Sequence, residues 1–137
     1  MNKRILVVND DLLLARTIDM CLTRRGHEVQ VFHNGIDAVE YLMEQTPHSL
    51  VLDIGLPDCD GWFIARLLGR LEGKRNVQLI VVSDLERDPK RIAEIKPYTY
   101  IHKPFDMRQL IQAVEESATS VAPAASGQGR ADTENGR

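Results

Sequence analysis

Apolar residues occur along this chain in short continuous runs, separated by longer segments in which they recur every three or four positions. The continuous runs are rich in valine, isoleucine and leucine, and they predict strands at residues 4–8, 27–32, 49–53, 77–83 and 98–102. Near-continuous runs of this length are typical of strands that are covered on both faces, as in a parallel sheet.

The segments between these runs have the periodicity of amphipathic helices. Their apolar stripes consist of Leu14, Ile18, Cys21 and Leu22; Val39, Leu42 and Met43; Ile64, Leu67, Leu68 and Leu71; and Met107, Leu110, Ile111 and Val114. A shorter helix is predicted between Pro89 and Pro97. Asn34, Asp60 and Asp106 precede three of the helical segments and are predicted N-caps, because their side chains can accept hydrogen bonds from the first turn.

The alternation of five strands with five helices predicts an α/β fold. Parallel strands need crossover connections, and right-handed crossovers place helices on both faces of a doubly wound five-stranded parallel sheet. We assign residues 1–118 to this domain. Residues 119–137 are rich in alanine, serine and glycine, and they predict a disordered tail or linker, because they cannot bury enough apolar surface to offset the entropy of ordering.

Composition narrows the classes of function. The net charge is −3, so no broad basic surface is available for direct binding of nucleic acid. No apolar run approaches the roughly 20 residues of a membrane span, and the N-terminal apolar run is too short for a secretory signal. The two cysteines, Cys21 and Cys59, have no paired spacing and fit a reducing compartment, so we expect a cytoplasmic protein.

Polar residues follow the predicted strands at the places where ligands bind to such sheets. Asp10 follows the first strand, Asp53 ends the third, Ser83 ends the fourth and Lys103 follows the fifth. The carboxyl ends of parallel strands lie at one edge, so we expect these groups to converge. Crowded carboxylates need a cation, most simply Mg²⁺, and a carboxylate beside Mg²⁺ and an ammonium can attack a phosphoryl group.

The motifs "ILVVNDD", "LVLDIGLPDCDGW", "IVVSD" and "YIHKPF" occur in this order, and with them the chain resembles the receiver domain of two-component response regulators over residues 3 to about 118. The resemblance implies a flavodoxin-like receiver fold and a Mg²⁺-dependent phosphoacceptor, not an enzyme that turns over a substrate. By that resemblance the phosphoacceptor is Asp53, the metal ligands are Asp10, Asp53, the Gly55 carbonyl and Asn9 through water, the phosphate-pairing lysine is Lys103, and the switch residues are Ser83 and Tyr100.

The same resemblance implies the partners. A sensor histidine kinase or a phosphotransfer protein donates the phosphoryl group, and a downstream protein reads the surface of the fourth helix, fifth strand and fifth helix. The family precedent also allows a homodimer to form through that surface after phosphorylation. The sequence contains no recognisable output domain, which leaves open whether this is a stand-alone receiver or a piece of a longer protein.

Two residues depart from the family pattern. Asn9 stands where the family usually has a second acid, and a rival alignment pairs Asp10 with Asp11 instead. Asp84 stands where the family favours a small residue; we expect it to point to solvent and cap the fourth helix, although a carboxylate there could also repel an incoming phosphate. These departures motivate an alternative function, a receiver-like interaction module that works without phosphorylation.

Two other functions fit less well. A phosphatase with an aspartate nucleophile needs a second aspartate two residues after the first, but that position is Gly55. A flavin or nucleotide carrier needs a glycine- or serine-rich phosphate loop after the first strand, but the chain has "NDDLLLAR" there, and its acids would repel phosphate in the absence of a metal.

Overall fold

A computed structural model describes residues 3–58, 60–74, 76–86 and 88–120. Cys59 and the part of the predicted tail that follows Ser120 lie outside the described residues. The elements along the chain are β1 (Arg4–Val8), α1 (Leu12–Arg24), β2 (Glu28–Phe32), α2 (Gly35–Glu44), β3 (Ser49–Asp53), α3 (Gly61–Arg70), β4 (Gln78–Ser83), α4 (Pro89–Ile95), β5 (Thr99–His102) and α5 (Met107–Ser120).

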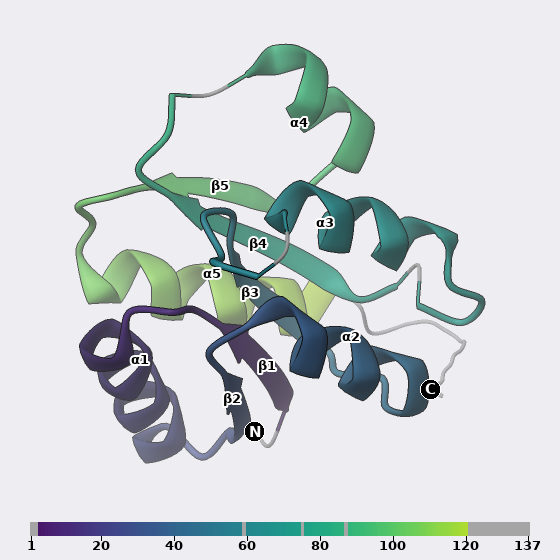
Figure 1. The fold of residues 1–137 in the computed structure, drawn as a ribbon. Helices are drawn as coiled ribbons and strands as arrows, with labels where there is room; N and C mark the ends of the chain where they lie inside the picture. Colours follow the sequence, from purple (N-terminus) through teal and green to yellow (C-terminus); the bar gives the residue numbers. More distant parts are fainter. Residues whose placement is uncertain (1–2, 59, 75, 87, 121–137) are drawn as a thin grey trace.

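The strands form one parallel sheet in the order β2-β1-β3-β4-β5, which confirms the predicted doubly wound α/β fold. α1 and α5 cover one face of the sheet, and α2, α3 and α4 cover the other (Figure 1). The strand order reverses between β1 and β3, and ligands of open α/β sheets bind at such a switch point. The candidate residues at the ends of β1 and β3 therefore lie at the expected place.

Side-chain alternation along the strands fills both halves of the core. Leu6 and Val8 of β1 point toward α2 and α3, whereas Ile5 and Val7 point toward α1 and α5. All five residues of β3 are buried, including its last residue, Asp53. The continuous apolar runs in the sequence correspond to strands that are covered on both faces.

Helix starts match the predicted caps in three places. The Asn34 side chain accepts a hydrogen bond from the backbone of Asp37, and Asp60 accepts one from Trp62. The Asp106 side chain accepts a bond from the Arg108 backbone at the start of α5.

The expectation that Asp84 caps the fourth helix is wrong. Asp88 is the N-cap of α4, and its carboxylate accepts hydrogen bonds from Lys90 and Arg91. Pro89 occupies the first helical turn, where its fixed φ suits a helix and its missing N–H is not needed. Asp84 lies exposed in the loop between β4 and α4, so only the expectation that it faces solvent is confirmed.

α4 is held lightly against the rest of the domain. None of its residues is buried, and only Ile92 and Ile95 pack partly against the core. The Arg91 guanidinium lies 5.3 Å from the ring centroid of the buried Trp62 of α3, a cation–π contact that adds a tether. Elements with few buried contacts open at low free-energy cost, so α4 is suited to change position.

Across the part of the chain that the structure describes, no helix combines the length and the apolar character needed to cross a membrane.

Candidate functional site

Asp53 is placed by β3 at the centre of the sheet edge. The last register pairs are Val8 with Leu52 on the β1 side and Asp53 with Val82 on the β4 side. Asn9 and Ser83, which come directly after these positions, therefore flank the carboxylate. Asp53 is only 5% exposed, so its charge needs partners within the protein.

Both carboxylate oxygens of Asp53 have a donor. The Lys103 ammonium donates to Oδ2 at 2.9 Å, and the Gly55 backbone N–H donates to Oδ1 at 3.0 Å. Lys103 is held there by its own backbone, whose N–H donates to the Ser83 carbonyl oxygen at 2.8 Å. The Lys103–Pro104 peptide bond is cis. The predicted nucleophile and the predicted phosphate-pairing lysine are thus in direct contact.

The acids after β1 divide into two roles. Asp11 is the N-cap of α1, and its Oδ1 accepts a hydrogen bond from the Leu14 backbone at 3.1 Å. Asn9 is buried, and its side-chain oxygen accepts the Asp11 N–H at 2.9 Å, whereas Asp10 is exposed. Asp11 therefore caps the helix, and Asp10 stays the predicted metal ligand.

The donor groups at this edge fit magnesium. Among the described residues, no three side chains of histidine, cysteine, aspartate or glutamate gather into one cluster that could hold a metal. A magnesium site does not require three such side chains. Asp10, Asp53 and the Gly55 carbonyl supply oxygen atoms only, and Mg²⁺ typically binds through one or two carboxylates while it keeps several waters. Each Asp53 oxygen retains a lone pair beyond the one that accepts a hydrogen bond.

Ser83 and Tyr100, the predicted switch pair, are linked through one residue of the β4–α4 loop. The Leu85 N–H donates to the Ser83 hydroxyl oxygen at 2.9 Å, and the Tyr100 hydroxyl donates to the Leu85 carbonyl oxygen at 3.1 Å. Both switch side chains are buried, with Tyr100 only 5% exposed. The Ser83 hydroxyl is therefore joined by hydrogen bonds, through Leu85, to the loop that leads into α4 and to Tyr100.

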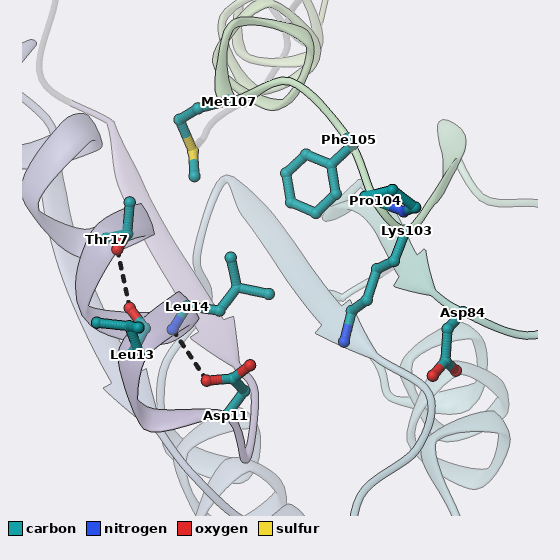
Figure 2. Close-up of a pocket in the computed structure, with 9 residues that line it drawn as sticks. All are labelled: Asp11, Leu13, Leu14, Thr17, Asp84, Lys103, Pro104, Phe105 and Met107. Atoms are coloured by element: carbon teal, nitrogen blue, oxygen red, sulfur yellow. Dashed lines mark hydrogen bonds between the residues drawn. The ribbon is translucent and has the colours of Figure 1, made fainter.

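A surface cavity of 630 Å³ opens at Lys103, between the start of α1 and the start of α5. Figure 2 shows the Lys103 side chain reaching into it between the carboxylates of Asp11 and Asp84. The remaining lining residues are Leu13, Leu14, Thr17, Pro104, Phe105 and Met107. The cavity therefore joins the end of β5 to the first turn of α1, and Asp84 lines it together with Lys103.

A family model described as the response regulator receiver domain matches residues 5–115, most of the chain. The chain belongs to the response regulator receiver family. Receiver domains are signalling modules, and the family works with histidine kinases and downstream effectors in two-component systems.

Solved structures share the fold. The chain superposes on a CheY-like receiver domain from Methanospirillum hungatei with a TM-score of 0.82 and 22% identity, covering 88% of this chain and 97% of that one. The receiver domain of a sensor histidine kinase from Pseudomonas aeruginosa, which has a magnesium ion coordinated in its active-site cleft, superposes with a TM-score of 0.78 and 25% identity. That match covers 87% of this chain and 99% of the other. The BeF₃-activated receiver domain of DrrB, a Thermotoga maritima protein, superposes with a TM-score of 0.76 and 27% identity, covering 87% of this chain and 99% of the other.

Two contacts around this receiver site have no signal in the sequence. The His33 ring contacts the Asn9 carbonyl oxygen at 3.1 Å. The Asp58 carboxylate accepts hydrogen bonds from Gly35 and Ile36, which lie more than 20 residues earlier in the chain. Both contacts join different loops, and local patterns such as capping spacing do not reveal them.

Replacing Tyr100 by phenylalanine should test its link to the loop. The variant loses the hydroxyl that donates to the Leu85 carbonyl, and one neutral hydrogen bond contributes about 1 kcal/mol to the free energy of unfolding. We expect urea unfolding to show a loss of this size. A variant as stable as the wild type would mean that this hydroxyl does not restrain the β4–α4 loop.

Proposed function

We propose that this receiver accepts a phosphoryl group on Asp53 from a histidine kinase, in a Mg²⁺-dependent reaction, and that this changes its α4–β5–α5 surface for partner binding. The main support is the contact at 2.9 Å between the buried Asp53 carboxylate and the Lys103 ammonium, at the edge of the sheet where Asp10 follows β1. The contact supports Asp53 as a nucleophile beside a fixed cation, and the position of Asp10 after β1 supports it as a second oxygen ligand.

The transfer makes one bond and breaks one. An Asp53 oxygen forms a bond to phosphorus while the bond from phosphorus to the kinase imidazole nitrogen breaks, and the electron pair leaves with that nitrogen. Magnesium, when held by Asp10, Asp53 and the Gly55 carbonyl, would supply neutralising charge to the phosphoryl oxygens. Lys103 would shift from Asp53 toward the phosphoryl group, which then carries the negative charge.

The switch would run through Leu85. The Ser83 hydroxyl accepts a bond from Leu85 and retains its own hydrogen, which it can donate to a phosphoryl oxygen on Asp53. If the Ser83 hydroxyl turned toward the phosphoryl group, it would either break its hydrogen bond with the Leu85 N–H or draw the Leu85 backbone with it. The Leu85 carbonyl oxygen also accepts a hydrogen bond from the Tyr100 hydroxyl. Because Tyr100 is already buried, we infer that the β4–α4 loop and the lightly held α4 change more than the aromatic ring.

A direct test measures the mass of the whole chain. Incubation with Mg²⁺ and either a small acyl phosphate or a candidate histidine kinase should add one phosphoryl group, and chelation of Mg²⁺ should prevent it. Absence of uptake from every donor would refute the proposal. That outcome would favour the alternative of a phosphorylation-independent interaction module, for which Asn9 and Asp84 are the motivating residues.

Asp84 provides a prediction about donors. Its carboxylate lines the same cavity as Lys103, so it should repel small anionic donors. We expect Asp84→Asn and Asp84→Ala each to speed uptake from a small acyl phosphate by about two- to fivefold, the size expected for one exposed charge, with less gain in high salt. A rate that rises only in Asp84→Ala would assign the effect to side-chain size, and unchanged rates in both would remove Asp84 from donor access.

A further inference from the structure

The first turn of α2 is capped by two side chains that are far apart in sequence. A helix leaves its first backbone N–H groups without partners inside the helix. Asn34, the local N-cap, accepts the N–H of Asp37 at 2.9 Å. The N–H groups of Gly35 and Ile36 donate instead to the two carboxylate oxygens of Asp58, at 2.7 and 3.0 Å.

Asp58 belongs to the loop that follows β3, so this contact ties that loop to α2. The N–H of Gly35, and to a smaller extent that of Ile36, lowers the pKa of the Asp58 carboxyl below its usual value. The positive end of the helix dipole also favours a carboxylate at this position. Asp58 is therefore charged at neutral pH and clamps the loop with both oxygens.

The clamped loop carries the proposed metal ligand. Gly55 lies three residues before Asp58, and its N–H also donates to the Asp53 carboxylate. The other end of the loop is fixed by the Gly61 N–H, which donates to the Ile54 carbonyl at 3.2 Å. Between these points the Leu56 N–H donates to the Ile54 carbonyl oxygen at 3.0 Å. The Asp58 carboxylate is the contact that ties this stretch to α2, and Gly55 itself is exposed.

The same β2–α2 connection also touches the opposite side of the site. His33 contacts the Asn9 carbonyl oxygen, and Asn9 donates its N–H to the Phe32 carbonyl oxygen at 3.0 Å. A carbonyl oxygen can only accept, so the ring Nδ1 must carry the proton in this contact. Residues 32–36 therefore join the loop after β1 to the loop after β3, the two segments that supply the proposed metal ligands.

We propose that Asp58 is a positioning residue for magnesium binding, because its clamp on α2 holds the loop that presents the Gly55 carbonyl. This inference rests on the proposed function for the identity of the metal ligands. Groups that orient metal ligands commonly change metal affinity by 10- to 100-fold when they are removed. Loss of the clamp should weaken metal binding and leave the nucleophile and Lys103 intact.

The test compares Asp58→Ala and Asp58→Asn with a matched control, Asp37→Asn. Asp37 is an exposed acid in the first turn of the same helix, and its carboxylate accepts a hydrogen bond from the Asn34 side chain at 2.9 Å, which an asparagine oxygen can still accept. Its replacement by asparagine therefore removes the same charge without touching the loop. Calorimetric titration with Mg²⁺ should give a dissociation constant about tenfold higher for Asp58→Ala. It should give an intermediate value for Asp58→Asn, whose amide keeps one acceptor oxygen, and a change below about twofold for the control.

Two further readouts separate positioning from a general loss of structure. Amide exchange measured by NMR should accelerate at Gly55 and Leu56 in Asp58→Ala and stay unchanged in the control. Phosphoryl uptake should require more Mg²⁺ for half-maximal rate but reach a rate within about twofold of wild type at saturation. If Asp58→Ala does not fold, Asp58→Asn supports the same comparison.

The outcomes distinguish this inference from the proposed function. Equal Mg²⁺ affinity in Asp58→Ala and Asp37→Asn, or a lower rate at saturating Mg²⁺ with unchanged affinity, would overturn the positioning role alone. Wild-type protein that binds Mg²⁺ but takes up no phosphoryl group would overturn the proposed function and leave the role of Asp58 standing. Wild-type protein that binds no Mg²⁺ would overturn both.

Discussion

Replacing Asp53 by asparagine should abolish phosphoryl uptake, with a decrease of at least about a thousandfold in rate. The amide keeps the size and most of the shape of the side chain at this buried position, but it lacks the negative oxygen that attacks phosphorus. Lys103 loses its charge partner, yet its side chain is 23% exposed and can turn to water. The measurement is the mass of the intact protein after incubation with a phosphodonor and Mg²⁺.

The control for this result is Asp37→Asn, which changes an exposed acid outside the site and should leave uptake at the wild-type level. Circular dichroism should show that both variants are folded. Uptake by Asp53→Asn at the wild-type rate would mean that another residue accepts the phosphoryl group. It would also reduce the contact between Asp53 and Lys103 to a structural ion pair.

The fold was largely predictable because its strongest signals are local. A strand covered on both faces needs a continuous apolar run, and β1 and β3 have the predicted bounds of residues 4–8 and 49–53. The helices begin after side chains that can cap them, as at Asn34 and Asp60. Asp84 and Asp88 are both acids close to α4, and only the path of the loop decides which one caps the helix.

The site was predictable to the extent that parallel topology determines it. Once the strands are parallel, Asp53 and the residues after β1 and β5 must meet at one edge, and the contact between Asp53 and Lys103 follows from that convergence. The contacts of His33 and Asp58 could not be predicted in this way. They depend on how two loops fold over that edge, which no periodic pattern encodes.

Replacing Gly61 by alanine should give the largest loss of stability among single small changes near the site. A Cβ atom at this position would lie 2.6 Å from the Ile54 Cα, 2.7 Å from the Ile54 carbonyl oxygen and 2.9 Å from the carbonyl carbon. All three are backbone atoms of the residue after β3, so no side chain can rotate away. We expect a loss of about 3 kcal/mol, at the upper end for overpacking, and a melting temperature roughly 10 °C lower.

The matched control is Gly69→Ala in the same helix, where an added Cβ meets no heavy atom within 4 Å. Alanine is the better helix former, so this variant should gain about 0.5 kcal/mol. The same preference acts at Gly61, and a net loss there therefore means that the close approach of α3 to β3 outweighs it. A Gly61→Ala protein as stable as Gly69→Ala would show that α3 can move away from Ile54. If α3 cannot move away, the Ile54 backbone must shift instead. That shift should disturb the adjacent Asp53 and slow phosphoryl uptake as well.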